Sequence, residues 1–205
     1  MLDERDATES DNGSARQRLI DSAVRLIHAG SYHSVSVHDV CADAGVNKGS
    51  FYYYFASKRD LALATIEVQW EHHRTGLYEK AFAPDIPPLD RIIRFFDMLP
   101  DWTMTLAVGG DLLGCPFGNL GVEMATEDHG IRDKVREVLV DRLACYFAIA
   151  IQEASEAGDI EPVDAQAAAV RLVAYVEGVY LMAKVEDDPE LFARLGRAAL
   201  GLIPG

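Results

Sequence analysis

The stretch that decides the fold covers residues 45–55 and reads Gly45-Val46-Asn47-Lys48-Gly49-Ser50-Phe51-Tyr52-Tyr53-Tyr54-Phe55. It opens with a glycine, which can take the left-handed backbone conformation that commonly ends a helix. Two residues later, Asn47 is a good N-cap for a second helix. The stretch therefore predicts a tight turn at Gly45 and a new helix that begins at Lys48.

The segment before this turn has the signals of a short amphipathic helix. Ser36 and Asp39 have the Ser-x-x-Asp spacing of a capping box, which places the helix start near Val37. The apolar residues that follow share one helical face, and they are Val37, Val40, Cys41 and Ala44. Two short helices joined by a glycine turn form a helix-turn-helix unit, whose second helix enters the major groove of DNA.

The second helix has a packed side and an open side. Phe51 and Phe55 are four residues apart and should face the interior, and Tyr52 is also interpreted as packing. The open side carries lysine, serine and tyrosine, which bond to phosphate oxygens or base edges, and a glycine that lets the backbone approach. The predicted DNA-binding set is Ser36, Lys48, Gly49, Ser50, Tyr52, Tyr53, Tyr54 and Lys58.

Lys58 enters this set through a second capping box, Ser57-Lys58-Arg59-Asp60. The box places two cations at a helix start, where free backbone amides already favour an anion. Lys58 is therefore the predicted phosphate anchor.

Residues 44–58 resemble the DNA-binding signature of the TetR family of bacterial transcriptional regulators. The resemblance continues upstream, where an apolar stripe is followed by Gly30 and Ser36; the stripe consists of Ile20, Ala23, Val24 and Ile27. It implies an all-α homodimer that binds a palindromic DNA operator, without a cofactor, and represses transcription. It also implies release of the operator when a small-molecule effector enters the C-terminal domain.

The charge distribution is compatible with this interpretation. The chain has 33 acidic and 19 basic residues and a net charge of −14. Residues 14–59 nevertheless carry six basic and three acidic side chains, a net charge of +3. Because charges are screened within about 8 Å at physiological salt, the local excess decides how the chain meets phosphate. One such module offers few ion pairs with DNA, which favours a dimer.

The sequence predicts an acidic, disordered tail at 1–13, a three-helix DNA-binding domain at 14–60 and a larger helical effector-binding and dimerisation domain at 61–205. The predicted first helix is capped near Ser14, and further helices are expected at 57–81, 89–104, 131–157, 163–184 and 188–202, without strands. The acidic start lacks the pattern of a secretory signal, and the longest apolar run, 143–151, is too short to span a membrane. With three cysteines and no export signal, we expect reduced thiols in a cytoplasmic protein.

The last two predicted helices have apolar stripes with small residues, which would let helices approach closely. Two such helices from each subunit would form a four-helix interface about a two-fold axis, as a palindromic operator requires. The predicted interface residues are Leu172, Val176, Tyr180, Leu191, Leu195, Ala198 and Leu202. The alternative is that these stripes pack on the body of their own subunit.

Cys115 is a candidate effector sensor. It precedes Pro116, which suits the first position of a helix, so the thiol would lie at the N-cap. The positive end of a helix lowers the pKa of a thiol there and raises its thiolate fraction. The spacing of Gly114, Cys115, Asn119, Leu120 and Glu123 also resembles a segment of TetR-family repressors that respond to electrophiles or oxidants. The alternative is a small residue chosen to fit a tight helix entry.

A pocket without cysteine chemistry is the other candidate for effector binding. Five aromatic residues from separated helices are candidates to line a cavity in the body, where bundle proteins often bind ligands. They are Trp70, Trp102, Phe117, Tyr146 and Tyr175, of which Phe117 adjoins the glycine-rich break at 109–114. The alternative for each is ordinary core packing, and no more than two are expected to touch a ligand.

Two other classes of protein are weighed. His72 and His73 are adjacent and point about 100° apart on a helix, while Glu123 and Glu127 are four residues apart and could share a metal ion. Neither a phosphate-binding glycine loop nor a nucleophile elbow is present in the sequence. A metal-dependent helical enzyme is therefore the weaker alternative, and no metal site is predicted. A purely structural adaptor would leave the polar face of the Lys48 helix unexplained.

Overall fold

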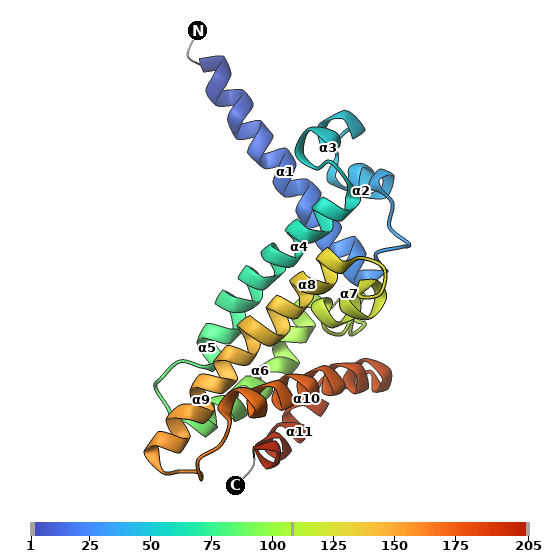
Figure 1. Cartoon of the computed structure of the whole chain (residues 1–205). Helices are drawn as coiled ribbons and strands as arrows, with labels where there is room; N and C mark the ends of the chain where they lie inside the picture. The colour runs from blue at the N-terminus through green and yellow to red at the C-terminus, as the bar shows by residue number, and fades with distance from the viewer. Residues whose placement is uncertain (1–2, 108, 204–205) are drawn as a thin grey trace.

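The computed structural model describes the backbone of residues 3–107 and 109–203 and the side chains of residues 15–107 and 109–203. Over these ranges the fold is all-α, as predicted, without a β-strand. Figure 1 shows an elongated molecule with a small helical head at one end, a larger body at the other and α4 running between them.

The head consists of α1 (Asp3–Ala29), α2 (Val37–Ala44) and α3 (Lys48–Tyr54). Its core is one cluster of buried side chains from these helices and from the start of α4, among them Leu19, Ile20, Ala23, Val40, Cys41, Phe51, Phe55 and Leu61. A second, larger cluster begins at Ala62 and fills the body. This change of core within α4 supports the predicted domain boundary near residue 60, which stays a prediction.

The helix expected at 57–81 forms as one helical run with an unpredicted widening. It comprises α4 (Lys58–His73), a π-helical turn (Arg74–Tyr78) and α5 (Glu79–Ala81). The ring of Trp102 lies against Gly76 in this turn, where a Cβ atom would overlap the ring. The absence of a side chain at residue 76 thus allows Trp102 to approach the backbone of the connecting helix.

The body is a bundle whose helices match the predicted order. Its elements are α6 (Pro88–Leu106), α7 (Pro116–Met124), α8 (His129–Arg136), a second π-helical turn (Glu137–Leu143), α9 (Ala144–Ala157), α10 (Ala165–Glu186), α11 (Leu191–Ala199) and a 3-10 turn (Leu200–Leu202). Helix α6 continues through Pro100, while α9 ends at Gly158, whose φ is 80°. Helix α10 packs on α9 and α11, and α11 packs on α6.

The first helix differs from its prediction. It begins at Asp3 and not at the proposed Ser14 cap. The backbone of 3–13 therefore continues the helix, because this segment contains no proline to stop it. Met1 and Leu2, together with the side chains up to Ser14, lie outside the described residues, so the disorder expected for the acidic tail is a prediction that this part of the chain does not test.

The body core encloses a histidine. His73 Nδ1 lies 2.7 Å from the Gln69 carbonyl, and its ring contacts Trp102 and Phe117 at centroid distances of 5.1 and 5.2 Å. Its Nε2 is buried without a hydrogen-bond partner. Burial lowers the pKa of His73 to about 4, so the ring is neutral at pH 7.

We predict that His73 makes the fold sensitive to mild acid. The unfolded chain binds a proton at this histidine below its ordinary pKa of 6.5, whereas the folded chain does so only near 4. Its contribution to the free energy of unfolding is therefore complete above pH 6.5 and is lost as the pH falls through this window, by roughly 1–3 kcal/mol.

Urea unfolding at several pH values checks this prediction. His73→Phe should flatten the dependence between pH 6.5 and 4, while His72→Phe, at the exposed neighbouring position, should leave it unchanged. Equal slopes in the wild type and His73→Phe would contradict the prediction.

Candidate functional site

The turn between α2 and α3 has the predicted geometry. Gly45 has a φ of 63°, its N–H donates to the Ala42 carbonyl at 3.3 Å, and the Val46 N–H donates to the Cys41 carbonyl at 2.9 Å. These two bonds are those of a Schellman cap. Asn47 Oδ1 then accepts the Ser50 N–H at 2.8 Å and caps α3. Short-range hydrogen bonds thus fix where α3 starts and how it leaves the turn.

Helix α3 separates its aromatic residues into two sets. Phe51 is fully buried and Phe55 is 4% exposed, whereas Tyr53 is 75% exposed. Tyr52 is 58% exposed, so its assignment to the packed side is wrong, although its ring makes a T-shaped contact with Phe51 at a centroid distance of 5.1 Å. Lys48 and Gly49 are exposed, and Ser50 and Tyr54 are half-buried. The structure therefore gathers the predicted α3 residues on one open surface.

The predicted phosphate anchor has a partner inside the protein. Lys58 is half-buried at the start of α4, and its Nζ donates to the Tyr32 carbonyl and lies 4.1 Å from the centroid of the Tyr32 ring. Burial lowers the pKa of Lys58. The Ser36 hydroxyl is also engaged, because it donates to Asp39 Oδ2 at 2.7 Å in the predicted capping box. Both residues thus stabilise the head; the Ser36 cap was predicted from the sequence, whereas the contact of Lys58 with Tyr32 was not.

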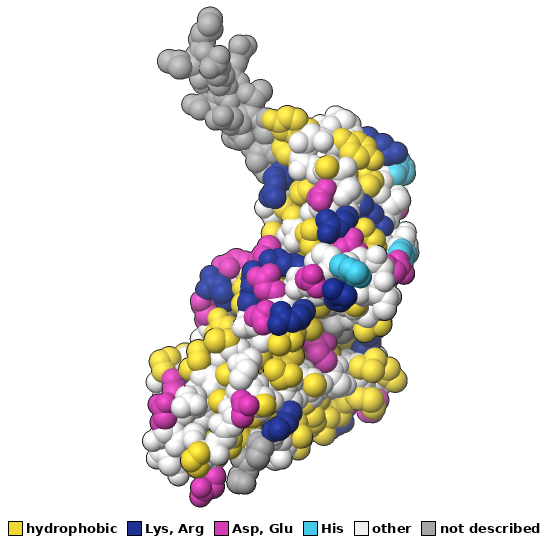
Figure 2. All heavy atoms as spheres, viewed as in Figure 1, with side chains coloured by type: hydrophobic (Ala, Val, Ile, Leu, Met, Phe, Trp, Pro, Cys, Tyr) yellow, Lys and Arg dark blue, Asp and Glu magenta, His cyan; other side chains and the backbone are white. Residues whose placement is uncertain are grey.

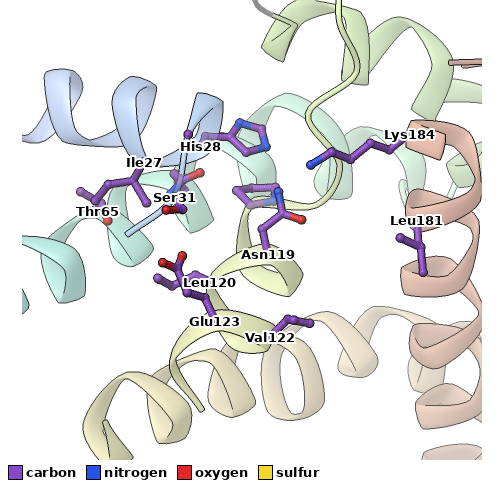
Figure 3. Close-up of a pocket in the computed structure, with 13 residues that line it drawn as sticks. Ile27, His28, Ser31, Thr65, Asn119, Leu120, Val122, Glu123, Leu181 and Lys184 are labelled. Atoms are coloured by element: carbon purple, nitrogen blue, oxygen red, sulfur yellow. The ribbon is translucent and has the colours of Figure 1, made fainter. Parts of the chain in front are cut away.

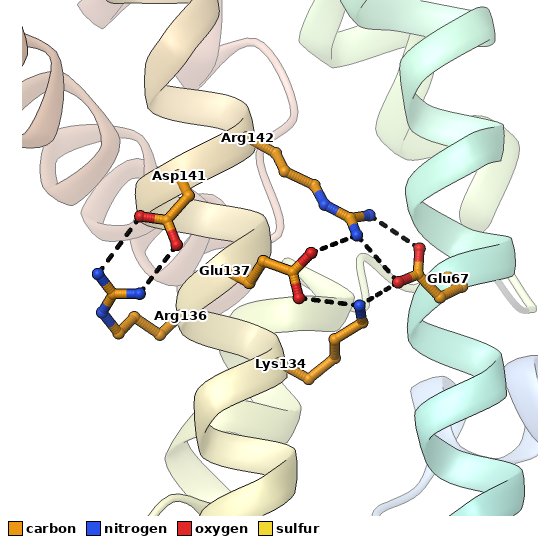
Figure 4. Close-up of polar contacts among 6 residues, drawn as sticks. All are labelled: Glu67, Lys134, Arg136, Glu137, Asp141 and Arg142. Carbon is orange, nitrogen blue, oxygen red and sulfur yellow. Dashed lines mark hydrogen bonds and ion pairs between the residues drawn. The ribbon is translucent and has the colours of Figure 1, made fainter.

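Four charged residues join the connecting helix to the body (Figure 4). Arg142 donates to both oxygens of Glu67, at 2.8 and 3.0 Å, and also to Glu137, while Lys134 contacts both carboxylates. The hydrogen bonds from Arg142 lower the pKa of Glu67 to about 2. These ion pairs, which we call the Glu67 network, connect α4 to α8 and to the π-helical turn 137–143. A displacement of α4 relative to these two elements would therefore disrupt the ion pairs.

Cys115 lies at the N-cap of α7 as predicted, with Pro116 at the first helical position, but its chemistry differs from the expectation. Its Sγ accepts the Gly118 N–H at 3.4 Å. The residue is only 7% exposed, and burial, reinforced by the nearby Glu177 carboxyl, raises the pKa of the thiol well above its ordinary value. The predicted lowering of this pKa is therefore wrong, because desolvation outweighs the capping amides.

Two adjoining cavities separate α7 from α10. The first, of about 530 Å³, is bounded by the end of α1, by α4, by α7 and by α10. Figure 3 shows His28, Asn119, Glu123 and Lys184 around it. The second, of about 440 Å³, is lined by Cys115, Glu177 and Tyr180, and it shares Asn119, Val122, Leu181 and Lys184 with the first. Sequence periodicity gave no signal for this groove, because it forms between helices distant in the chain.

The aromatic residues predicted to line a cavity pack mainly against other rings. Trp70, Tyr78 and Tyr146 pack together at centroid distances of 5.4 and 5.8 Å, Phe117 packs on His73, and Tyr175 packs on Phe96. The predicted rings do meet in one body, but they fill its interior. Trp102 borders a hollow of about 310 Å³ between the π-helical turn 74–78 and α6.

The predicted dimer residues are divided by their burial. Leu172, Val176, Tyr180 and Leu191 belong to the core of their own subunit, so their assignment to an intersubunit surface is wrong. Leu195 and Leu202 are half-buried, and Ala198 is exposed. Another stripe of α10 is apolar and exposed: Val170, Leu181, Met182 and Val185, the last 71% exposed. Figure 2 shows hydrophobic side chains over the C-terminal end of α10.

The residues weighed for metal binding have other partners. Glu123 accepts backbone N–H groups from the head, and Glu127 pairs with His33. Across the part of the chain that the structure describes, no group of three or more His, Cys, Asp or Glu residues is arranged to hold a metal ion. In the same part, no helix combines the length and apolar character of a membrane span.

Comparisons with known proteins assign both halves of the chain. The model described as "Bacterial regulatory proteins, tetR family" matches residues 19–65, and the one described as "Tetracyclin repressor-like, C-terminal domain" matches residues 88–199. The transcriptional regulator AcuR of Cereibacter sphaeroides is 32% identical over 185 residues, 88% of this chain and 81% of that protein. The transcriptional repressor DhaR of Mycobacterium sp. is 26% identical, covering 85% of each chain.

Solved structures agree in fold. The regulatory protein TetR from Rhodobacter sphaeroides superposes with a TM-score of 0.80 and 30% identity, covering 93% of this chain and 99% of that one. The reduced form of NemR from E. coli has the same TM-score at 20% identity, covering 93% of this chain and 97% of that one.

We predict that the three cysteines react in the order of their exposure. Cys145 is exposed, whereas Cys41 and Cys115 are buried and burial raises both of their pKa values. A maleimide reagent at neutral pH should therefore label Cys145 first, and mass spectrometry of the digested protein resolves the order. Labelling of Cys115 ahead of Cys145 in the native protein would contradict the buried environment described for it.

Proposed function

Because the chain belongs to the TetR family of bacterial transcriptional regulators, we propose that it is a homodimeric repressor that binds a palindromic operator through α3 and releases it when a small-molecule effector binds. The observation that carries this proposal is the two-sided character of α3. Two large aromatic rings, Tyr52 and Tyr53, are exposed on a helix whose opposite side buries Phe51 completely. Helices that only fill a core do not leave such residues in solvent beside an exposed lysine.

The surface of α3 suits the major groove in shape and chemistry. Its hydroxyl groups can donate to phosphate oxygens or base edges, and Lys48 adds a positive charge that attracts the backbone. At the start of the helix, Gly49 has no side chain and Ser50 a small one, which leaves room for the sugar–phosphate chain. We therefore assign operator contact to Lys48, Gly49, Ser50, Tyr52, Tyr53 and Tyr54. Ser36 and Lys58 stabilise the head through their contacts with Asp39 and Tyr32.

The proposed dimer interface is centred on α10, with a different set of residues from the sequence prediction. Val170, Leu181, Met182 and Val185 form an exposed apolar stripe on α10, and Ala174 and Gly178 lie exposed between them. The small central residues would let two helices approach closely, and a contiguous apolar surface of this kind marks an interaction site. A two-fold axis through this face would repeat the head as a palindromic operator requires.

The proposed effector site is the groove between α7 and α10. It combines apolar walls with a few polar groups, which is the usual character of a ligand site. A ligand there would touch α7, α10 and the end of α1 together, so its binding energy can act on the head. Cys115 borders this groove, and an electrophile-responsive mechanism would require the buried thiol to be uncovered before it reacts.

We predict that α3 substitutions weaken DNA binding without unfolding the protein. The assay is fluorescence anisotropy with a duplex that the wild-type protein selects from a random-sequence pool. Tyr53→Ala should weaken binding by roughly tenfold or more, since a base-edge contact contributes about 1–3 kcal/mol. Lys48→Ala should also lower the slope of log K against log salt by about 1. Ile149→Ala, at an exposed apolar site on α9, is the control; equal binding by all variants would refute the assignment.

We also predict that a charge on the α10 stripe separates the subunits. Leu181→Glu places a carboxylate within the proposed apolar interface, where its desolvation opposes association. Light scattering should show a lower molar mass than for the wild type at the same concentration, and operator affinity should fall with it. Ile149→Glu adds the same charge on α9 and should stay dimeric. A dimeric Leu181→Glu would remove this face from the proposed interface.

A further inference from the structure

The loop between α1 and α2 is held by a carboxylate from the body. Glu123, on α7, accepts the backbone N–H of Tyr32 at Oε2 and that of His33 at Oε1, both at 2.7 Å. Each carboxylate oxygen thus takes one amide of the loop, and charge-assisted bonds of this length are stronger than bonds between neutral groups. We call this pair of bonds the Glu123 clamp.

Tyr32 has a second partner, Lys58 on α4. Its carbonyl accepts the Lys58 ammonium, and its ring lies under the same ammonium. Lys58 opens α4, and the loop leads directly into Ser36, the N-cap of α2. The clamp therefore acts at the point where α7, α4 and the helix-turn-helix unit meet.

Three further contacts join the head to the segment around α7. Arg59 Nε donates to Asp128 Oδ2 at 2.6 Å, His33 Nε2 lies 3.0 Å from Glu127 Oε2, and His28 Nε2 lies 3.0 Å from the Gly114 carbonyl. All the body partners fall within residues 114–128. One short segment thus carries these contacts, whereas the Glu67 network acts on α4 alone.

Two polar residues of the segment around Cys115, Asn119 and Glu123, have structural roles at the two ends of α7. Asn119 Nδ2 donates to the Leu113 carbonyl at 2.7 Å and shapes the entry into α7. Glu123 follows four residues later, one helical turn along, which places its carboxylate on the same side of α7. The asparagine positions the start of the helix, and the glutamate links that helix to the head.

We propose that Glu123 is a positioning residue through which α7 sets the orientation of the DNA-reading head relative to the body. The inference rests on the proposed operator binding and goes beyond it by naming the bond that fixes the head. Glu123 and His28 also line the 530 Å³ cavity, in which Figure 3 shows both side chains. A molecule in that cavity therefore contacts the clamp directly.

A measurement without DNA tests the clamp. Nitroxide labels on the exposed native Cys145 and on a second cysteine introduced by His38→Cys, at an exposed site on α2, report the distance between head and body. Labelled chains are diluted in excess unlabelled protein, so that only distances within one chain are seen. Glu123→Gln removes the negative charge and one acceptor, and it should broaden the distance distribution.

Two further variants complete this measurement. Asp128→Asn should broaden the distribution in the same way, because asparagine retains the cap of α8 but loses the charge that pairs with Arg59. Glu161→Gln, in the exposed loop between α9 and α10 at the far end of the body, is the matched control and should leave it unchanged (Figure 1). A distribution for Glu123→Gln that equals that of the wild type would overturn the proposal.

A DNA-binding measurement separates positioning from general stabilisation. The duplex selected by the wild-type protein is compared with versions that have one base pair added or removed between the half-sites. Glu123→Gln should bind the original duplex about five- to tenfold more weakly and should discriminate less between the spacings. Equal weakening at every spacing would assign Glu123 a merely structural role. If the wild-type protein selects no duplex, the proposed function fails, and the distance measurement alone decides on the clamp.

Discussion

The burial of Phe51 and Phe55 beneath α3 is the constraint on which the reading surface depends. A helix of seven residues is too short to be stable alone in water. Helix α3 persists because one side is anchored in the core of the head and because its first turn is capped by Asn47. Because Phe51 faces the core, Tyr53, two positions further along the helix, faces solvent. Exposure of an aromatic ring is thus a consequence of how the opposite face is held.

The head is joined to the body by two different kinds of link. Helix α4 passes without a break from the core of one to the core of the other, and the Glu67 network holds its flank. The contacts of segment 114–128 instead hold the end of α1, the loop before α2 and the first turn of α4. Because the groove between α7 and α10 adjoins the second link, a ligand need not disturb the aromatic interior to influence the head.

Apart from the Ser14 cap, which α1 passes because it begins at Asp3, features set by neighbouring residues were predicted well from the sequence. The Ser36 capping box, the left-handed Gly45, the Asn47 cap and the Cys115–Pro116 helix entry all depend on a few adjacent residues, and each is present. Features that depend on burial were predicted less well. The periodicity of α10 showed an apolar face but not that its own subunit covers Leu172 and Val176. Burial and the nearby Glu177 carboxyl raise the pKa of Cys115. This direction was not predicted, because Glu177 and the core that surrounds the thiol are distant from Cys115 in the sequence.

The π-helical turn at 74–78 lets the connecting helix hold one residue more than a regular α-helix would hold over the same turn. A π turn spreads its extra residue over nearly the same rotation as an α turn, in which successive residues are rotated by about 100°. Deleting a single residue there would convert the widened turn into a regular one, and the start of α4 and the helices packed on it would keep their side of the body. The widened turn therefore absorbs a change of one residue without changing the azimuth of the head.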